Sequence, residues 1–283
     1  MKLVRFGSRG AEKPGLVGPD RKIKDCSAHV ADYDHAFFAS GGLERLRGLA
    51  ASPGGLPDVP AGERIGAPVA RPRNVFAIGL NYSDHAKETG AAIPAEPILF
   101  MKATSAICGP YDPIVIPRGS EKTDWEVELG IVIGRDAYAL SSKAAAHEHI
   151  AGYCVANDVS ERAFQLERGG QWSKGKSSPS FLPLGPWLVT PDEVADPQNL
   201  SLTLDVNGRR RQNGTTATMI FDVLHIVHYL SHFLLLEAGD VVLTGTPPGV
   251  GMGLKPPEFL RAGDVVELGV SGLGNQRSVC QTS

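Results

Sequence analysis

Cysteine is scarce in this sequence, which excludes several kinds of site. The 283 residues include four cysteines and no Cys-x-x-Cys pair; they stand at Cys26, Cys108, Cys154 and Cys280. We therefore expect neither a disulfide framework nor a zinc–thiolate site. A reducing compartment fits this cysteine usage.

Long apolar runs and an excess of charge of one sign are also missing. No uncharged apolar segment approaches the roughly 20 residues of a membrane-spanning helix, and the first seven residues lack the apolar core of a signal peptide. The net charge of −3 predicts no basic surface for nucleic acid. We therefore expect a cytoplasmic protein that binds neither membranes nor nucleic acids.

Glycine and proline are abundant instead. The 33 glycines and 21 prolines predict many turns and short strands rather than a helical bundle. Between residues 53 and 72 the sequence is rich in Gly, Pro and Ala and shows little periodicity, as in a linker. We expect a small, β-rich N-terminal domain with its linker over residues 1–70, and a catalytic domain over 71–283.

The segment 124–134 predicts a β-strand with two acids on one face. Apolar side chains recur at every second position from Trp125 to Ile133, which is typical of a strand. Because successive side chains point to opposite faces, one face is apolar and the other carries Glu126 and Glu128. Two neighbouring carboxylates repel each other, and either solvent or a bound cation must offset this repulsion.

A third carboxylate follows the next predicted strand. Gly152–Ala156 has a strand pattern, and Asp158 stands just after its end, where site residues are common. With Glu126 and Glu128 it would form an all-oxygen site, which suits Mg²⁺, Mn²⁺ or Ca²⁺. Few protein ligands would leave room for water and substrate.

A short predicted helix carries an imidazole beside a carboxylate. Ser83 or Asp84 can cap its start and Gly90 its end. His85 and Glu88 are three residues apart and therefore share a face of this helix. A carboxylate holds the tautomer of a neighbouring imidazole and raises its basicity, as in a general base. The alternative is a pair of polar residues on an exposed helix.

The remaining pattern predicts further short strands and a few helices. Strand patterns cover Lys2–Phe6, Asn74–Gly79, Pro97–Lys102 and Ile114–Ile116, hairpins cover 15–25 and 200–212, and helical patterns cover Leu43–Ala50, Ala144–Ile150, Val159–Arg168 and Met219–Leu236. We interpret the three histidines of the last helix as a polar face or a subunit contact rather than a zinc site: His225, His228 and His232.

The run Gly170–Ser177 matches the phosphate-binding pattern G-x-x-x-x-G-K-[ST]. A P-loop follows a strand and opens a helix, whereas here a helical pattern precedes the run and Pro179 and Pro183 follow it. The context favours an accidental match, although Lys174 and Lys176 can still act as cations near an anionic substrate. A non-enzymatic module that binds a nucleoside triphosphate stays open as an alternative of another class.

Four motifs, in this order, resemble those of the fumarylacetoacetate hydrolase family. They are Gly79–His85, Glu126–Gly130, Asn157-Asp158 and Leu243–Gly251, and the resemblance covers roughly residues 72–275. It implies a mixed, β-rich α+β fold, a β-roll with a smaller N-terminal domain that is usually dimeric. The short N-terminal part resembles the compact bacterial branch of the family.

The resemblance also implies roles for single residues. Glu126, Glu128 and Asp158 correspond to ligands of Mg²⁺ or Mn²⁺, His85 and Glu88 to a dyad that activates water, Lys176 to the active-site lysine with Lys174 as the fallback, and Arg162, Gln165 and Thr246 to residues that contact substrate. One departure is Leu80, because many members that cleave acylpyruvates have arginine before Asn-Tyr.

The implied activity is metal-dependent hydrolysis of a 2,4-dioxo acid. Water activated by His85 would attack C4, and pyruvate enolate, stabilised by the metal and Lys176, would leave. The products would be pyruvate and a second acid such as lactate. Among compact members the sequence is most similar to hydrolases of 2,4-diketo-3-deoxy-L-rhamnonate or -fuconate. Alternatives are an isomerase or decarboxylase of a 2-oxo dicarboxylate from aromatic degradation, and ureidoglycolate lyase.

Overall fold

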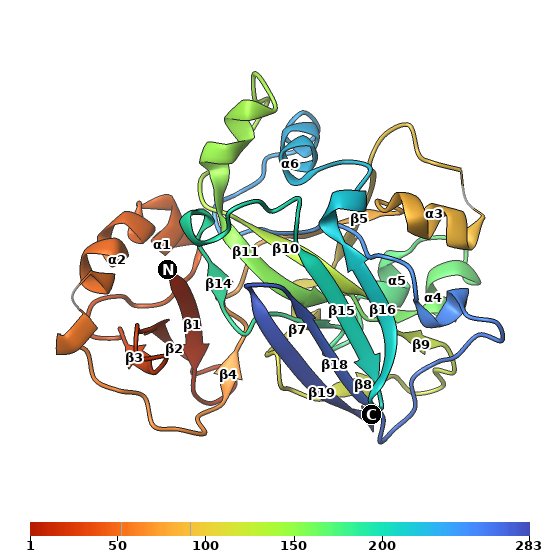
Figure 1. Ribbon diagram of the computed structural model, residues 1–283, viewed down its shortest axis with the longest axis horizontal. Coiled ribbons are helices and arrows are strands. Elements are labelled where there is room, and N and C mark those ends of the chain that lie inside the picture. The colour runs from red at the N-terminus through yellow and green to blue at the C-terminus, as the bar shows by residue number, and fades with distance from the viewer. Residues whose placement is uncertain (52, 91) are drawn as a thin grey trace.

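A computed structural model describes residues 1–51, 53–90 and 92–283. The fold is a mixed, β-rich α+β fold (Figure 1) whose larger sheet has ten strands: β1 Lys2–Phe6, β2 Lys13–Val17, β3 Ile23–Asp25, β4 Ile65–Gly66, β5 Val75–Gly79, β6 Ile98–Lys102, β10 Val127–Ile133, β11 Ile150–Asn157, β14 Leu188–Val189 and β17 Val241–Leu243. Their order is β3-β2-β1-β14-β11-β10-β17-β5-β6, and β4 pairs with β1.

A second sheet packs against the centre of the first. Its five strands are β8 Ile114–Ile116, β15 Ser201–Val206, β16 Arg209–Thr215, β18 Val265–Val270 and β19 Gly274–Thr282, in the order β16-β15-β18-β19-β8. In Figure 1 this sheet lies in front of β10 and β11, and β15 and β18 both contact β10. Two further pairs join β7 Ile107–Cys108 to β13 Leu182–Pro183, and β9 Thr123–Asp124 to β12 Ser160–Glu161. Among the described residues, neither sheet closes into a barrel.

The N-terminal strands extend the large sheet at one side. β1 pairs antiparallel with β14, with Lys2 opposite Val189. Figure 1 shows β1 to β4 beside the central strands, with the helices α1 (His35–Ala39) and α2 (Gly42–Ala50) above them. Residue 70, where we expect a domain boundary, lies between β4 and β5.

The other helices are short and lie around the sheets. They are α3 Ser83–Thr89, α4 Arg162–Leu166, α5 Ser173–Lys176 and α6 Val223–Ser231. Short 3-10 helices are η1 Pro53–Gly55, η2 Thr104–Ala106, η3 Ala144–His149, η4 Pro191–Glu193, η5 Thr216–Thr218 and η6 Gly251–Gly253. The strand predictions at Lys2–Phe6 and Ile114–Ile116, both hairpins and the helix near Leu43–Ala50 are confirmed.

Three helix predictions were too long or of the wrong type. The pattern over Met219–Leu236 forms only the shorter helix α6. Asp222 caps the start of this helix, and Leu236 lies beyond its end and pairs with Ala137. The pattern over Val159–Arg168 gives helix only from Arg162, because the preceding two residues pair with β9 instead. The pattern over Ala144–Ile150 forms a 3-10 helix.

Strand β10 lies at the centre of the core. All seven of its residues are buried, on both faces, and the second sheet covers one of these faces through β15 and β18. The predicted alternation therefore distinguishes two buried faces rather than a buried face and a solvent face. Among the described residues, no helix has the length and apolar character needed to cross a membrane.

Candidate active site

The pairing of β10 with β11 brings three carboxylates together. The antiparallel ladder sets Val127 opposite Asn157, and the same register continues beyond the site with Asp124 opposite Ser160. Between these pairs the Asp158 amide donates to the Glu126 carbonyl over 2.9 Å. The single strand that we predicted over 124–134 is divided: β9 ends at Asp124 and β10 begins at Val127, so Glu126 stands just before β10 and Glu128 lies within it. The two glutamates are two residues apart in extended backbone and lie on the same side, and Asp158 is the neighbour of Glu126 across the ladder.

The three acids are buried and close. One oxygen of each lies within 4.8 Å of the others, and their exposed fractions are 6%, 2% and 0% for Glu126, Glu128 and Asp158. Among the described residues this is the one group of three or more acids, histidines and cysteines with such spacing. Buried carboxylates at this distance need cations.

Two lysines and an arginine supply part of the positive charge. The Lys176 ammonium donates to Glu126 Oε2 and to Asp158 Oδ2, each over 2.7 Å. Lys102, at the end of β6, donates to the other oxygen of Asp158. The Arg162 guanidinium lies 2.7 Å from Glu126 Oε1 and 2.8 Å from Asp124 Oδ2. Four carboxylates thus face three cations.

Glu128 is the acid that these cations leave unbalanced. Burial opposes ionisation of Glu126, but Lys176 and Arg162 outweigh burial and lower its pKa to about 2. For Glu128, burial and repulsion from Asp158 and Glu126 raise the pKa well above its usual range, and a hydrogen bond from the Gly245 amide offsets this only in part. A further cation at this point would relieve the repulsion, and three buried carboxylate oxygens fit a divalent metal ion.

The predicted dyad forms on α3. His85 Nδ1 and Glu88 Oε2 are 3.0 Å apart, and the Gly249 amide donates to both oxygens of Glu88 over 3.0 and 3.2 Å. The predicted cap was wrong in part: Tyr82 is the N-cap, and Ser83 is the first helical residue. Gly90 ends the helix in a left-handed conformation, with φ 69°, as expected.

The dyad and the acids meet at one cavity of about 210 Å³. Seven of the predicted site residues line it: His85, Glu126, Glu128, Arg162, Gln165, Lys176 and Thr246. Glu88 and Asp158 stand behind the lining and hold His85 and Lys176. Lys174 is exposed and donates to the Arg168 carbonyl instead, so the structure brings Lys176, not Lys174, to this cavity.

The three residues expected to contact substrate already have protein partners. The Arg162 guanidinium donates to Gln165 Oε1 over 3.1 Å, beside its ion pairs. The Thr246 hydroxyl donates to the Val127 carbonyl over 2.9 Å and accepts from Gln212 over 2.8 Å. These bonds hold the walls of the cavity in place.

Sequence reasoning missed three parts of this arrangement. Lys102 ends the strand predicted over Pro97–Lys102, and a charged residue after an apolar run was the only signal for it in the sequence. Asp124 lies in the segment that we expected to be one strand, but its role is to hold Arg162 and to accept from the Gly251 amide over 2.7 Å. Gln212 lies in the predicted hairpin arm, and only the packing of the two sheets brings it to Val127 and Thr246.

The segment Gly170–Ser177 does not form a P-loop. It follows α4 and contains only the four-residue helix α5. The Lys176 ammonium is held by two carboxylates. A lysine in this position does not cradle a phosphate chain, which argues against the nucleotide-binding alternative.

The histidines of α6 lie away from the cavity. His228 Nε2 and His232 Nε2 are 3.2 Å apart on the surface, whereas the His225 ring stacks between Phe221 and Tyr229. They do not meet as three ligands among the described residues.

Residues 74–280 match the family model described as fumarylacetoacetate (FAA) hydrolase C-terminal. The chain belongs to the fumarylacetoacetate hydrolase family. A protein from Burkholderia multivorans, provisionally named a hydrolase, is 56% identical over 277 residues, which are 98% of this chain and 97% of that protein. The family assignment and the mixed β-rich fold expected from the sequence are thereby confirmed.

Solved structures of relatives share the whole fold. A protein from Mycobacterium smegmatis, provisionally named HpcE, is 37% identical with a TM-score of 0.88, and each chain is covered by 100%. A provisionally named 2-hydroxyhepta-2,4-diene-1,7-dioate isomerase from Mycobacterium abscessus is 32% identical with a TM-score of 0.83, over 100% of this chain and 99% of that one. Maleylpyruvate hydrolase from Sphingobium sp. SYK-6, solved with manganese(II) and pyruvate, is 27% identical with a TM-score of 0.83, over 100% of both chains.

Proposed function

We propose that the protein hydrolyses a carbon–carbon bond of a 2,4-dioxo acid of the acylpyruvate type, an activity of class EC 3.7.1. The observation that carries this proposal is that His85, held by Glu88, lines the same cavity as Glu126 and Glu128. One side of the cavity can hold a 2-oxo acid, and the other can deliver a water molecule to it. The products are pyruvate and a second carboxylic acid.

Glu126, Glu128 and Asp158 would hold the metal, with Mg²⁺ as the first candidate and Mn²⁺ or Ca²⁺ as alternatives. When bound, the ion supplies a Lewis acid that orients the 2-oxo acid and stabilises negative charge on its oxygens. The manganese ion and pyruvate in the maleylpyruvate hydrolase structure support this class of ligand.

His85 is the general base of the proposed reaction. Glu88 accepts the hydrogen bond of Nδ1, so Nε2 is the nitrogen that takes the proton of water. The oxygen of that water adds to the C4 carbonyl, and the bond between C3 and C4 breaks. Its electron pair moves to C3 as pyruvate enolate, which is then protonated, while C4 becomes the carboxyl carbon of the second acid.

Lys176 contributes positive charge next to the developing enolate. Burial lowers the pKa of a lysine, but Asp158 and Glu126 outweigh burial here and raise the pKa of Lys176. The ammonium therefore stays protonated, and its two carboxylate partners hold it at the cavity. A fixed charge in a water-poor site stabilises a developing anion strongly.

The cavity walls bear on the identity of the second acid. They are apolar away from the acids, with Ile78, Leu80, Phe100, Leu166, Trp172 and Met252. Leu80, in the position where many relatives have arginine, is one of these residues. This lining favours a small, largely apolar acyl group. The substrates that we expected from the sequence, 2,4-diketo-3-deoxy-L-rhamnonate or -fuconate, have a lactoyl group with a single hydroxyl, and acyl groups without a hydroxyl are the other class that this lining suits. Acylpyruvates of both classes are therefore included in the product assay.

The second candidate is isomerisation or decarboxylation of a 2-oxo dicarboxylate. The Mycobacterium abscessus relative named as an isomerase favours it, because the same metal and lysine can stabilise an enolate without attack by water. Ureidoglycolate lyase ranks third, since nothing in the cavity selects for it.

A product assay tests the proposal. The protein is incubated with Mg²⁺ or Mn²⁺ and a panel of acylpyruvates whose acyl groups are apolar or carry one hydroxyl, as in the lactoyl group, and pyruvate is measured with lactate dehydrogenase. We expect pyruvate and an equal amount of the second acid. Release of CO₂, or a shifted double bond without pyruvate, would select the second candidate. His85→Ala is the matched variant, and Lys174→Ala is the control on the exposed neighbour of Lys176.

We further propose that residues 1–70 form a small N-terminal unit, that the protein acts as a homodimer or a higher homo-oligomer, and that it works in the cytoplasm. Exposed Leu99 and Met101 on the outer strand β6 support a subunit contact. All four cysteines are free and buried, which suits a reducing compartment. Size-exclusion chromatography with light scattering tests the dimer.

A further inference from the structure

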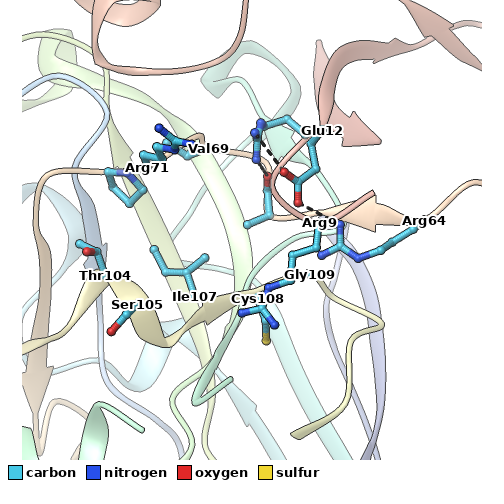
Figure 2. A pocket seen from close by; sticks show the side chains of 13 residues that line it. Arg9, Glu12, Arg64, Val69, Arg71, Thr104, Ser105, Ile107, Cys108 and Gly109 are labelled. Atoms are coloured by element: carbon cyan, nitrogen blue, oxygen red, sulfur yellow. Dashed lines mark hydrogen bonds and ion pairs between the residues drawn. The ribbon is translucent and has the colours of Figure 1, made fainter. Parts of the chain in front are cut away.

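A second cavity, of about 390 Å³, lies between the N-terminal segment and the start of the catalytic body. Four arginines line it, from three separate parts of the chain: Arg5, Arg9, Arg64 and Arg71. Figure 2 shows Arg71 on one side, Arg9 and Arg64 on the other, and Thr104, Ser105 and Ile107 along the remaining wall. It shares no lining residue with the catalytic cavity.

Two of these arginines are held in place by acids. Arg64 Nε and Nη2 donate to Asp112 over 2.8 and 2.6 Å, and its Nη1 donates to Glu12 over 2.9 Å. Arg5 donates to Asp32 over 2.7 and 2.9 Å. These pairs fix the two guanidinium groups as rigid parts of the wall.

Glu12 lies between the two fixed arginines and is ionised. Burial opposes its ionisation, but a backbone hydrogen bond, the hydrogen bond from Arg64 and the charge of Arg5 outweigh burial and lower its pKa. Its charge, with those of Asp32 and Asp112, offsets three of the four arginines. The wall therefore keeps a net positive charge.

The net positive charge comes from Arg9 and Arg71, because the three acids already outnumber their partners Arg5 and Arg64 by one. Neither takes part in an ion pair within the described part of the chain. The backbone of Arg71 has φ 47°, in the left-handed region that costs a residue with a side chain about 1 kcal/mol or more. Arg9 and Arg71 are exposed residues that line the cavity, so both guanidinium groups are accessible to a ligand.

The other groups of the wall suit binding rather than reaction. Thr104 and Ser105 add hydroxyl groups, which can donate to an oxyanion. Burial raises the pKa of the Cys108 thiol to about 12, so it stays protonated and is no nucleophile.

We propose that this cavity binds a small anion with two or more negative oxygens, either a phosphate group or a di- or tricarboxylate. Paired guanidinium groups bind such oxyanions through charge-assisted hydrogen bonds. Arg9 and Arg71 contact the anion from opposite sides, and Thr104 and Ser105 donate to its oxygens. The size of the cavity limits the ligand to a small molecule.

The position of the cavity ties the ligand to both parts of the fold. Arg9 belongs to the segment after β1, whereas Thr104 and Ser105 stand directly after Lys102 of the catalytic cluster. The Ala103 amide donates to the Ser177 hydroxyl over 2.9 Å, next to Lys176. A bound anion would therefore join the N-terminal strands to the segment that carries Lys102.

Binding is tested on the metal-free full chain at constant ionic strength. Calorimetry measures the binding of inorganic phosphate in one titration series and of citrate or succinate in another. Chloride, added as sodium chloride, is the reference anion. The variant Arg9→Gln/Arg71→Gln is compared with the control Arg209→Gln, an exposed arginine of the β15–β16 hairpin. We expect about a tenfold or greater loss of affinity in the first variant and none in the control.

A local readout separates this site from anion binding in the catalytic cavity. Modification of arginines by phenylglyoxal, read by peptide mass spectrometry, should slow at Arg9 and Arg71 of the unmutated protein when the anion is present. The anion with the lower dissociation constant, phosphate or a carboxylate, identifies the class of ligand that the cavity prefers. The proposal is overturned if neither series binds more tightly than chloride, if the double variant binds as the control does, or if neither arginine is protected.

Discussion

Replacing Glu128 by glutamine should make the metal-free protein more stable while it abolishes the response to metal. The variant keeps the shape of the side chain and an oxygen for the Gly245 amide, which donates to Glu128 over 2.7 Å. It removes one of three buried carboxylates whose oxygens lie within 4.8 Å. Stability and metal binding therefore change in opposite directions.

The gain can be estimated from this distance. Two unit charges 4.8 Å apart repel by about 3.5 kcal/mol at an effective dielectric constant of about 20. The raised pKa of Glu128 means that part of this cost is already avoided by protonation, so we expect a gain of about 1–3 kcal/mol in the free energy of unfolding. For a chain of this size the melting temperature should rise by about 2–4 °C for each kcal/mol.

The sign of the pH dependence gives a second check. A carboxyl whose pKa is raised on folding binds more protons in the native state, so the wild-type protein loses stability as the pH rises from the usual glutamate pKa of 4.5 towards the raised value. The glutamine variant has no such loss. Its advantage over the wild type should therefore grow with rising pH and shrink as the pH falls.

The assay is thermal unfolding in EDTA and then with excess Mg²⁺ or Mn²⁺. At one hundred times the dissociation constant, the metal should stabilise the wild type by about 2.7 kcal/mol, and the variant should show little or no shift. Glu148→Gln, at an exposed glutamate, is the control. The electrostatic reasoning fails if the variant melts at or below the wild type in EDTA, and the ligand assignment fails if it keeps the full metal shift.

Three further predictions concern the residues around the acids. His85→Ala should keep the metal-induced shift in melting temperature but lower kcat by about 10²–10⁴; a kcat near that of the wild type would remove His85 as the base. Lys102→Met should lower the free energy of unfolding by about 3 kcal/mol, because it breaks a buried ion pair with Asp158; denaturant unfolding measures this, and Lys87→Met, at an exposed lysine, should have no effect. Gly249→Ala should lower both the free energy of unfolding and kcat. The added Cβ would lie 1.9 Å from the Arg211 carbonyl oxygen and would shift the Gly249 amide that holds Glu88. Gly272→Ala is the control, because Gly272 also has positive φ but open space around it.

Local pattern was sufficient for most of the strands and for the cluster of three acids that we propose as metal ligands. The alternation around Glu126 and Glu128 places both on one strand face, and Asp158 stands at the end of the next strand along the chain. The antiparallel pairing of these two strands then makes the three acids neighbours. The His85–Glu88 spacing likewise needs only a single helical turn, which Gly90 ends as predicted.

The local sequence pattern did not predict the lengths of the helices or the partners of the buried polar side chains. The helix predicted from Val159 begins only at Arg162, because Ser160 and Glu161 pair with β9, a strand far back in the chain. The apolar residues after Ser231 pack without a helix, since Leu236 pairs with Ala137. Such competition between partners depends on contacts that no short segment contains.

The sequence alone determined which residue types could hold a cation and activate water, because the acids and the histidine lie on elements whose geometry is local. Only the tertiary structure decided how these groups are balanced. It brought Lys102, Lys176 and Arg162 from three separate segments to the same cluster of carboxylates, and within the described part of the chain it gave Glu128 no ion pair. Charge balance in a buried site depends on distances across the fold, and those distances do not follow from spacing along the chain.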